Sequence, residues 1–341
     1  MLLAGTLLTA VPDRDQYIGF AHRGALYATW IRDAPSPYLS KLQRFDPRVN
    51  GWQDVFVDDA RFNYSRPDAG RLPLIEYRES GGGASNNIFS VLDLASGQTT
   101  KIDAFALSPA TFHGGGGGPR GPRITFVLAG DRVAWSRINE LPGGVTEGEL
   151  RLAPLGDPAH FTTIGRSRAS IEALWLDDAT LGYLVGGSDQ DEIRVRDLAT
   201  GAERVLTRVV APGQDRGIGG MARSDRFLGW IENLPASAST PGGLMRSVFH
   251  AIDVASGSAR ELDLGATTCV SLAGNSLGFT WWCWDTGPTA TSLAYFDPRT
   301  WRSVEIVRSG DRLNDPSAFD GGFMWFDLVA GVRRVNALIV R

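Results

Sequence analysis

Short stretches in which apolar and polar residues alternate recur along the whole chain. One of them runs from Ile193 to Arg196, is followed by an Asp-Leu-Ala-Thr-Gly segment, and continues in a second alternating stretch from Glu203 to Leu206. Alternation with a period of two predicts a half-buried β-strand, and an Asp…Gly segment between two such strands predicts a tight turn. This stretch is therefore expected to form a β-hairpin.

Copies of this hairpin keep an Asp directly before the turn, at Asp46, Asp93, Asp253 and Asp297. A second mark, an aromatic residue in a preceding apolar strand, recurs seven times at intervals of about 44 to 58 residues. These aromatic residues are Trp30, Tyr77, Trp135, Tyr183, Trp230, Trp281 and Trp325. Repeats of about 40–50 residues are typical of propeller blades, so the sequence predicts an all-β fold, a seven-bladed β-propeller.

The two ends of the chain are expected to meet in one blade. The seventh repeat ends one strand short, and the apolar residues 2–11 precede the first complete repeat. We expect residues 1–11 to supply the missing outer strand of the last blade, because a closed ring leaves no unpaired edge. Residues 1–341 are then expected to form a single domain.

Connection lengths distinguish two edges of the blades, whose strands we name A to D in chain order. The A–B and C–D turns are short, whereas the B–C and D–A connections are long. Function concentrates on long loops held by a rigid framework, so we predict that the B–C/D–A face is the binding face. The long connections are residues 32–40, 79–87, 108–123, 139–149, 209–219 and 233–246.

The repeated strand, Asp-Leu-Ala-Thr-Gly turn and return strand resemble the TolB-like, WD40-like repeats of bacterial β-propellers over nearly the whole chain. The resemblance implies a fold found in envelope proteins and in dipeptidyl peptidases, which serves binding as well as catalysis. The Ser-Pro-Asp-Gly turn frequent in that family is absent, since Ala-Gly-Asp-Arg and Ala-Gly-Asn-Ser stand in its place. Pro154 also replaces the repeated Asp in the third unit.

Composition narrows the classes of partner. The 341 residues are 43% hydrophobic and 21% charged, with an interspersed net charge of −4, so we expect no nucleic-acid partner. The apolar opening segment is too short to span a bilayer, so no membrane span is predicted. It is either the remnant of a signal segment or the closing strand. We expect a monomer that is periplasmic or secreted, with a cytoplasmic location left open.

The two cysteines, Cys269 and Cys283, fall on neighbouring A and B strands of the sixth repeat. A two-residue turn at Gly274 and Asn275 would place Cys269 opposite Thr280. A disulfide therefore requires a bulge or a longer turn. Both the bonded and the free state stay open at this point.

Several motifs suggest chemistry but lack its structural context. The Gly-x-Ser-x-Gly pattern at Gly274 to Gly278 lies in a predicted hairpin, whereas a nucleophile elbow needs a strand followed by a helix. The acidic run 188–192 lacks the glycine and the further ligands of a calcium loop. The histidines share no common spacing, so we predict no metal site and no cofactor. These histidines are His22, His113, His160 and His250.

The glycine run 114–118, followed by Arg120 and Arg123, resembles a phosphate loop only in its glycine content. A phosphate loop needs a helix N-terminus or a Gly-Lys-Ser/Thr ending, and neither is present. We predict a mobile flap over the binding face instead.

Polar residues just after the aromatic residue of strand B are expected to surround the mouth of the propeller. Acids and guanidinium groups around a pocket are suited to acid–base chemistry or carboxylate binding, but they also form salt bridges between blades. Nearby, Trp282 and Trp284 share one strand face, and one of them is a candidate platform for a sugar or planar ligand. The candidate ligand-binding residues are Arg32, Arg78, Glu79, Arg137, Glu232, Trp282 and Asp285.

The sequence thus favours a non-catalytic propeller that binds a protein, a small molecule or a glycan at its B–C/D–A loop face. The alternative is a carbohydrate-active enzyme, a polysaccharide lyase or a hydrolase, with an Arg/carboxylate site at the channel mouth.

Overall fold

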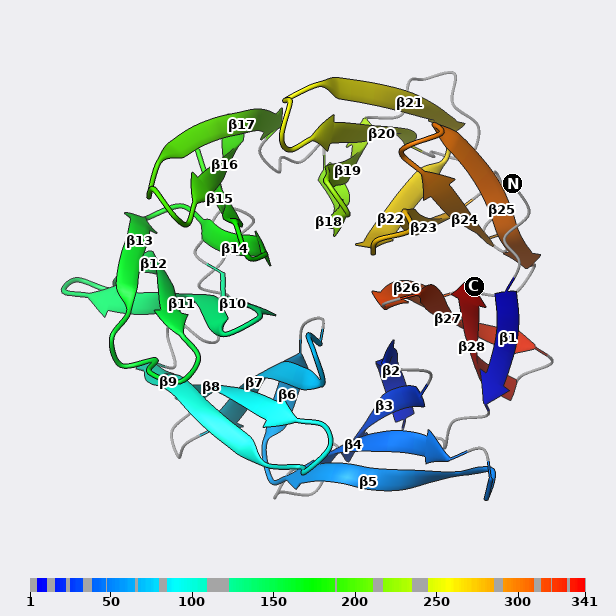
Figure 1. Ribbon diagram of the computed structural model, residues 1–341, viewed down its shortest axis with the longest axis horizontal. Coiled ribbons are helices and arrows are strands. Elements are labelled where there is room, and N and C mark those ends of the chain that lie inside the picture. Colours follow the sequence, from blue (N-terminus) through cyan, green and yellow to red (C-terminus); the bar gives the residue numbers. More distant parts are fainter. Residues whose placement is uncertain are drawn as a thin grey trace. The chain divides into compact units, whose positions relative to one another are not determined.

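The computed structural model describes most of the chain as β-strands. The described ranges are 5–10, 16–22, 25–32, 39–46, 48–64, 67–79, 85–108, 123–187, 189–210, 217–234, 245–284, 291–309, 314–319, 321–329 and 332–340. These residues form 28 strands and no helix (Figure 1). They assemble into seven four-stranded antiparallel sheets, the blades of a seven-bladed β-propeller, which confirms the expected fold class.

Blades 2, 3 and 4 belong to one compact unit, residues 32–40 and 56–212. Blade 2 contains β6 (Arg61–Tyr64), β7 (Arg71–Glu79), β8 (Ser85–Asp93) and β9 (Thr99–Leu107). Blade 3 contains β10 (Thr125–Ala129), β11 (Arg132–Leu141), β12 (Val145–Pro154) and β13 (Thr162–Ser167). Blade 4 contains β14 (Ile171–Leu176), β15 (Thr180–Val185), β16 (Gln190–Asp197) and β17 (Glu203–Val210).

Blades 5, 6 and 7 and most of blade 1 form the second unit, residues 1–31, 41–55 and 213–341. Blade 1 contains β2 (Gln16–His22), β3 (Ala25–Arg32), β4 (Leu39–Asp46) and β5 (Gly51–Asp58). Blade 5 contains β18 (Gly217–Ser224), β19 (Phe227–Leu234), β20 (Arg246–Asp253) and β21 (Ala259–Ala266). Blade 6 contains β22 (Thr268–Gly274), β23 (Phe279–Trp284), β24 (Thr291–Asp297) and β25 (Arg302–Ser309). The expectation of a single domain stays a prediction.

Blade 7 joins the two ends of the chain. Its strands are β26 (Asn314–Phe319), β27 (Gly322–Val329), β28 (Val332–Val340) and β1 (Gly5–Ala10), with β1 as the outer strand. The β1–β28 pairing is antiparallel and runs from Gly5 opposite Val340 to Ala10 opposite Val335. The predicted closure by the N-terminal segment is therefore confirmed.

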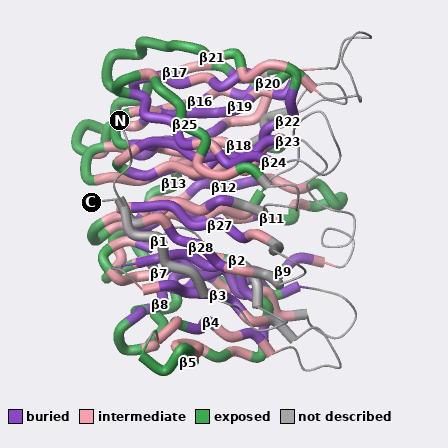
Figure 2. Tube along the Cα trace, turned by 90° about the vertical axis from the view of Figure 1, so that its right-hand side faces the viewer, coloured by how far each residue is buried: buried purple, intermediate pink, exposed green. Residues whose placement is uncertain are grey.

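Within each unit, neighbouring blades bury the middle strands between them. The seven aromatic residues of the repeat all lie on the second strand of a blade, and Trp135 and Trp281 are fully buried. Phe249 of blade 5, for example, packs against Phe279, Trp281 and Phe296 of blade 6. Buried positions accordingly run along the middle of the strands, and exposed ones gather at the turns (Figure 2).

The repeated Asp has a structural role in its turn. The Asp197 carboxylate accepts backbone N–H groups from Ala199 at 3.1 Å and Thr200 at 2.7 Å. Gly201, with φ of 72°, then adopts the left-handed conformation that closes the turn. Asp93 and Asp253 make the same contacts, and Gly97 and Gly257 have the same conformation. This turn chemistry explains why the Asp…Gly spacing recurs.

The first strands of several blades contain a β-bulge, and the bulge in β22 brings the two cysteines together. The pairing of β22 with β23 shifts between Val270 and Ala273, where Ser271 has φ of 56°. The shift places Cys269 opposite Cys283, and the two are joined by a disulfide bond. The sequence left open whether the two cysteines are bonded. They are bonded, and the bulge in β22 supplies the shift in register that the bond required.

We expect removal of residues 1–10 to lower the melting temperature by about 5 °C or more, because β28 would then expose an unpaired edge. The measurement is thermal unfolding followed by circular dichroism. A chain that begins at Gly5 keeps β1 and serves as the control. Equal melting temperatures for the two truncated chains would show that β1 contributes nothing to stability.

Candidate functional site

Four of the seven candidate residues have side chains that the structure describes: Arg78, Arg137, Glu232 and Trp282. Asp285 lies outside the described residues, as do the side chains of Arg32 and Glu79. Most of the expected long connections, including the glycine-rich flap with Arg120, also lie outside them.

The prediction of a long connection at residues 139–149 is wrong. Strand β11 continues to Leu141 and β12 begins at Val145, so only a three-residue turn separates them. Gly143 and Gly144, with φ of 84° and 75°, supply the left-handed conformations of a tight hairpin turn. The polar residues on either side of this turn belong to the strands.

Arg78 lies at the centre of a cluster of carboxylates where β5 leads into blade 2. Its Nη2 lies 2.8 Å from Asp58 Oδ1 and 3.5 Å from Glu76 Oε2, and its Nη1 lies 2.9 Å from Asp59 Oδ1. Arg78 and Glu76 are two positions apart on β7, so their side chains share one face of the strand. Three carboxyl groups thus surround one guanidinium.

The members of this Arg78 cluster differ in exposure. Glu76 and Asp58 are largely buried, and the Ser90 hydroxyl donates to Glu76 Oε1 at 3.0 Å. The side chains of Arg78 and Asp59, by contrast, are 42% and 66% exposed. Asp58 ends β5, and Arg78 lies near the end of β7, so the cluster sits at the edge where strands B and D end. This is the loop edge that the sequence predicts for binding.

Asp58 holds a proton more tightly than an ordinary carboxyl group. Burial, a hydrogen bond with Asp59 and the negative charge of Glu76 raise the pKa of Asp58 to about 6, against the opposing charge of Arg78. The same hydrogen bond lowers the pKa of Asp59. A neutral acid therefore lies beside an ionised one at mildly acidic pH.

Arg137 takes part in an ion-pair network between blades 2 and 3. Its Nη1 lies 3.1 Å from Oδ2 of Asp103 on β9, and Nη1 of Arg151 on β12 lies 3.2 Å from the same atom. The Trp135 indole N–H donates to this carboxylate at 2.9 Å. Arg137 thus joins two blades, in agreement with the salt-bridge interpretation.

Glu149 extends this network at a nearly inaccessible position, since its side chain is 2% exposed. Burial alone would raise the pKa of Glu149, but hydrogen bonds from Arg166, Asn139, Arg151 and Thr163 outweigh it and lower the pKa to about 2. The carboxylate therefore stays ionised and fixes the arginines around it.

Glu232 lies beside a histidine on blade 5. Its Oε2 is 3.3 Å from His250 Nε2, and Glu261 Oε2 is 3.8 Å from His250 Nδ1. The imidazole stacks on Trp230 with ring centroids 5.0 Å apart. The structure thus brings Glu232 together with a histidine that the sequence did not associate with it.

Trp282 and Trp284 point to the opposite face of β23 from Phe279, Trp281 and Cys283, as strand parity predicts. Trp282 is only 4% exposed and packs against Leu293 and Trp325. Trp284 is half-buried and meets Trp282 edge to face at 4.4 Å between ring centroids. Of the two, Trp284 offers more of its ring to a ligand.

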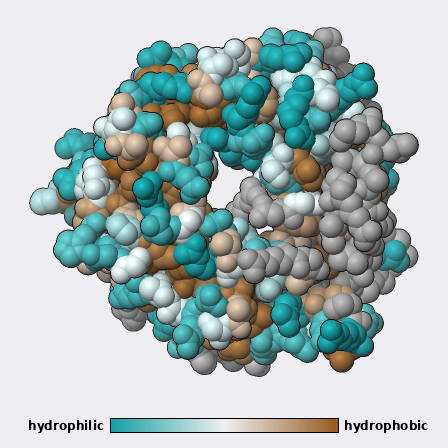
Figure 3. All heavy atoms as spheres, viewed as in Figure 1, coloured by the Kyte–Doolittle hydropathy of each residue, from teal (hydrophilic) through white to brown (hydrophobic). Residues whose placement is uncertain are grey.

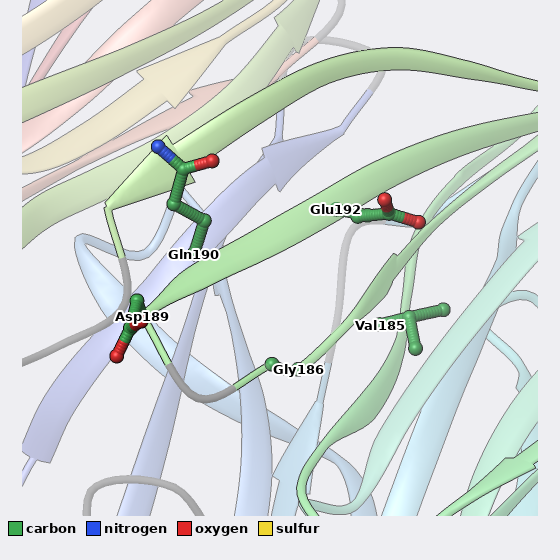
Figure 4. A pocket seen from close by; sticks show the side chains of 6 residues that line it. Val185, Gly186, Asp189, Gln190 and Glu192 are labelled. Atoms are coloured by element: carbon green, nitrogen blue, oxygen red, sulfur yellow. The ribbon is translucent and has the colours of Figure 1, made fainter.

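Asp189, Gln190 and Glu192 of the acidic run border a depression of about 530 Å³ at the loop edge of blade 4. Figure 4 shows Val185 and Glu192 together at one end of it and Asp189 and Gln190 at the other. The Glu192 carboxylate is held by Arg194 at 2.7 Å and Arg208 at 2.9 Å. Within the described ranges, no group of three or more His, Cys, Asp or Glu residues is arranged to hold a metal ion.

Asp58, Asp59 and Glu76 were not identified from the sequence. Asp58 is the last residue of β5 and Asp59 begins the short connection to β6, where acidic residues are ordinary turn residues. Glu76 interrupts an apolar strand, and a charged residue inside such a strand is a signal that a buried partner lies nearby. Glu76 also lies two positions before Arg78, and in a strand this spacing predicts that the two side chains share one face.

No protein-family model matches the chain, and no curated protein matches it in sequence. Several solved structures share its fold. A prolyl endopeptidase is 11% identical with a TM-score of 0.58, over 99% of this chain and 50% of that protein. An oligogalacturonate lyase in complex with manganese is 12% identical with a TM-score of 0.53, over 100% and 99% of the two chains.

TolB from Acinetobacter baumannii is also similar, with 11% identity, a TM-score of 0.43, and coverage of 92% of this chain and 79% of TolB. The seven-bladed propeller that the TolB-like resemblance implies is the fold that the strand pairing shows. The seven-bladed propeller is shared by a lyase and a peptidase, so at these identities it does not define an activity.

Replacement of Asp58 should change how stability depends on pH. Because its pKa is raised from 3.8 to about 6, Asp58 contributes stability that is complete below about pH 4 and is lost as the pH rises through 6. We expect the free energy of unfolding of the wild type, relative to Asp58→Asn, to fall by roughly 2 kcal/mol from about pH 4.5 to 7.5. Urea unfolding at the two pH values measures it.

Asp93→Asn is the matched control, since hydrogen bonds from Ser96 lower the pKa of this exposed turn carboxylate. The free energy of unfolding of the wild type, relative to Asp93→Asn, should not fall as the pH rises from about 4.5 to 7.5. A pH-independent difference between the wild type and Asp58→Asn would contradict a raised pKa.

Proposed function

We propose that this chain is a non-catalytic β-propeller binding protein that takes its ligand at the B–C/D–A loop edge. The Arg78 cluster is the observation that supports this function. Three carboxyl groups against one guanidinium leave a surplus of negative charge when all are ionised, and Asp59 is mostly exposed. A positively charged segment of a polypeptide ligand complements such a surface.

The framework beneath the cluster suits a binding role. Ion pairs and hydrogen bonds join blade 2 to blade 3 through Asp103, so the strands that carry the cluster are held in place. On the face shown in Figure 3, hydrophilic and hydrophobic side chains of the described residues are interspersed.

One observation favours a second candidate, the carbohydrate-active enzyme. Asp58, with a pKa of about 6, is a neutral acid beside the ionised Asp59 and a guanidinium. A paired acid and base of this kind are suited to proton transfer during cleavage of a glycosidic bond.

The binding function is tested by fluorescence anisotropy with two pools of random peptides, one rich in Lys and Arg and one rich in Asp and Glu. We expect saturable binding of the basic pool that weakens as salt is added, and about threefold weaker binding by Asp59→Asn. Glu305→Gln is the control, since Glu305 is an exposed acid paired with Arg308 on blade 6.

Equal binding of both pools, or an unchanged affinity in Asp59→Asn, would refute the proposed surface. Cleavage of uronate polymers by the wild type but not by Asp58→Asn would instead favour the enzyme.

We further infer that the protein works in an oxidising compartment, the periplasm or the exterior of the cell. The chain has two cysteines, and both are used in one buried disulfide bond. Such bonds persist outside the reducing cytoplasm. Within the described residues, no helix is long and apolar enough to cross a membrane.

Thiol labelling of the denatured protein, taken directly from cells under acid quench, checks this location. We expect labelling only after treatment with a reductant. Free thiols in the untreated sample would contradict an oxidising compartment.

A further inference from the structure

The Arg78 cluster holds more negative charge than its one guanidinium can balance. Asp58 Oδ1 and Glu76 Oε2 lie 2.8 Å and 3.5 Å from the same nitrogen, Nη2 of Arg78. The Asp58 and Glu76 side chains are only 11% and 7% exposed, so water screens the repulsion between their carboxylates poorly. Two buried carboxyl groups that share one cation favour a state in which one of them carries a proton.

Asp58 is the member of this pair that takes the proton. It shares a hydrogen bond with the carboxyl group of Asp59, and a bond between two carboxyl groups requires a proton on one of them. Burial, this hydrogen bond and the negative charge of Glu76 raise the pKa of Asp58 to about 6, against the opposing charge of Arg78. The charge of Asp58 therefore changes between about pH 5 and pH 7.

The titratable groups that face Asp58 come from two elements besides its own strand, β5. Asp59 lies in the connection to β6, and Glu76 and Arg78 lie on β7. Strand β8, which pairs with β7, supplies the Ser90 hydroxyl to Glu76 at 3.0 Å. Asp59 and Arg78 stay charged in this range, because the pKa of Asp59 is lowered and that of Arg78 is raised.

The charge of Asp58 decides how strongly the cluster attracts a cation. With Asp58 protonated, the carboxylates of Asp59 and Glu76 exceed the charge of Arg78 by one, and with Asp58 ionised the excess is two. A positively charged ligand reaches the cluster from the side of Asp59, which is 66% exposed, and binds the ionised form more tightly. By linkage, the bound cation favours loss of the proton to the same degree.

We propose that the Arg78 cluster is a proton-controlled binding site, at which a basic polypeptide segment competes with a proton on Asp58, so that the segment is bound at neutral pH and released at mildly acidic pH. This inference rests on the proposed function and adds its regulation. Asp59 provides the exposed contact, and Asp58 sets the charge behind it. The control needs no movement of the strands, because a single proton passes between Asp58 and water.

The experiment measures the affinity for the Lys- and Arg-rich peptide pool by fluorescence anisotropy from pH 5.0 to pH 7.5 at constant ionic strength. The peptides lack His and have blocked termini, so their charge is constant in this range. We expect the dissociation constant of the wild type to fall about fivefold as the pH rises. Asp58→Asn should keep the weaker affinity at every pH, whereas Glu305→Gln on blade 6 should keep the wild-type dependence.

Glu76→Gln is the second variant, in case circular dichroism shows that Asp58→Asn does not fold. It removes a negative charge that raises the pKa of Asp58, so the midpoint of the pH dependence should move to lower pH. An unmoved midpoint would contradict the assignment to Asp58.

A wild-type affinity that is independent of pH overturns this proposal and leaves the binding function intact. A dependence of equal size in Asp58→Asn assigns the effect to other groups, such as the histidines, and also overturns it. The absence of saturable binding at every pH refutes the binding function and, with it, its control by Asp58.

Discussion

Burial of both faces of each middle strand is the constraint on which the rest of this structure depends. Within each unit a blade packs between neighbours, so its second and third strands have no solvent-exposed face and carry large apolar residues such as Trp135 and Phe249. A charged residue in such a strand must find a partner or reach an edge. Glu149, with its arginines, meets this constraint by pairing, and Arg78 meets it at the loop edge.

Much of the fold could be predicted because its signals are local. The carboxylate of a residue such as Asp197 orders its own turn by accepting two backbone N–H groups. The same residue types therefore recur wherever the chain forms this hairpin. The pairing of β1 with β28 followed from counting strands, since the last repeat lacked one. Turn chemistry and strand number are both visible in a single sequence.

The candidate site was less predictable because its contacts join residues from different strands. Arg78 was identified from its position after the aromatic residue of strand B, but the carboxylates around it come from the end of β5, from the short connection after it and from the middle of β7. The disulfide depended on a bulge at Ser271, and nothing in the local pattern specifies on which residue a strand shifts register. Side-chain pairing across strands is set by register, which alternation alone leaves undetermined.

The disulfide of blade 6 also limits how its first two strands can come apart. A hairpin ordinarily frays from the end opposite its turn, since the last pairs have neighbours on one side only. Here the turn at Asn275 closes one end, and the bond between Cys269 and Cys283 closes the other. Cys269 is further tied to blade 5, because its N–H donates to Ser247 at 2.9 Å and its carbonyl accepts from Asn233 at 3.0 Å. The chain therefore leaves β23 for the loop edge from a fixed point, and the outer pairs of this hairpin cannot separate unless the disulfide is reduced.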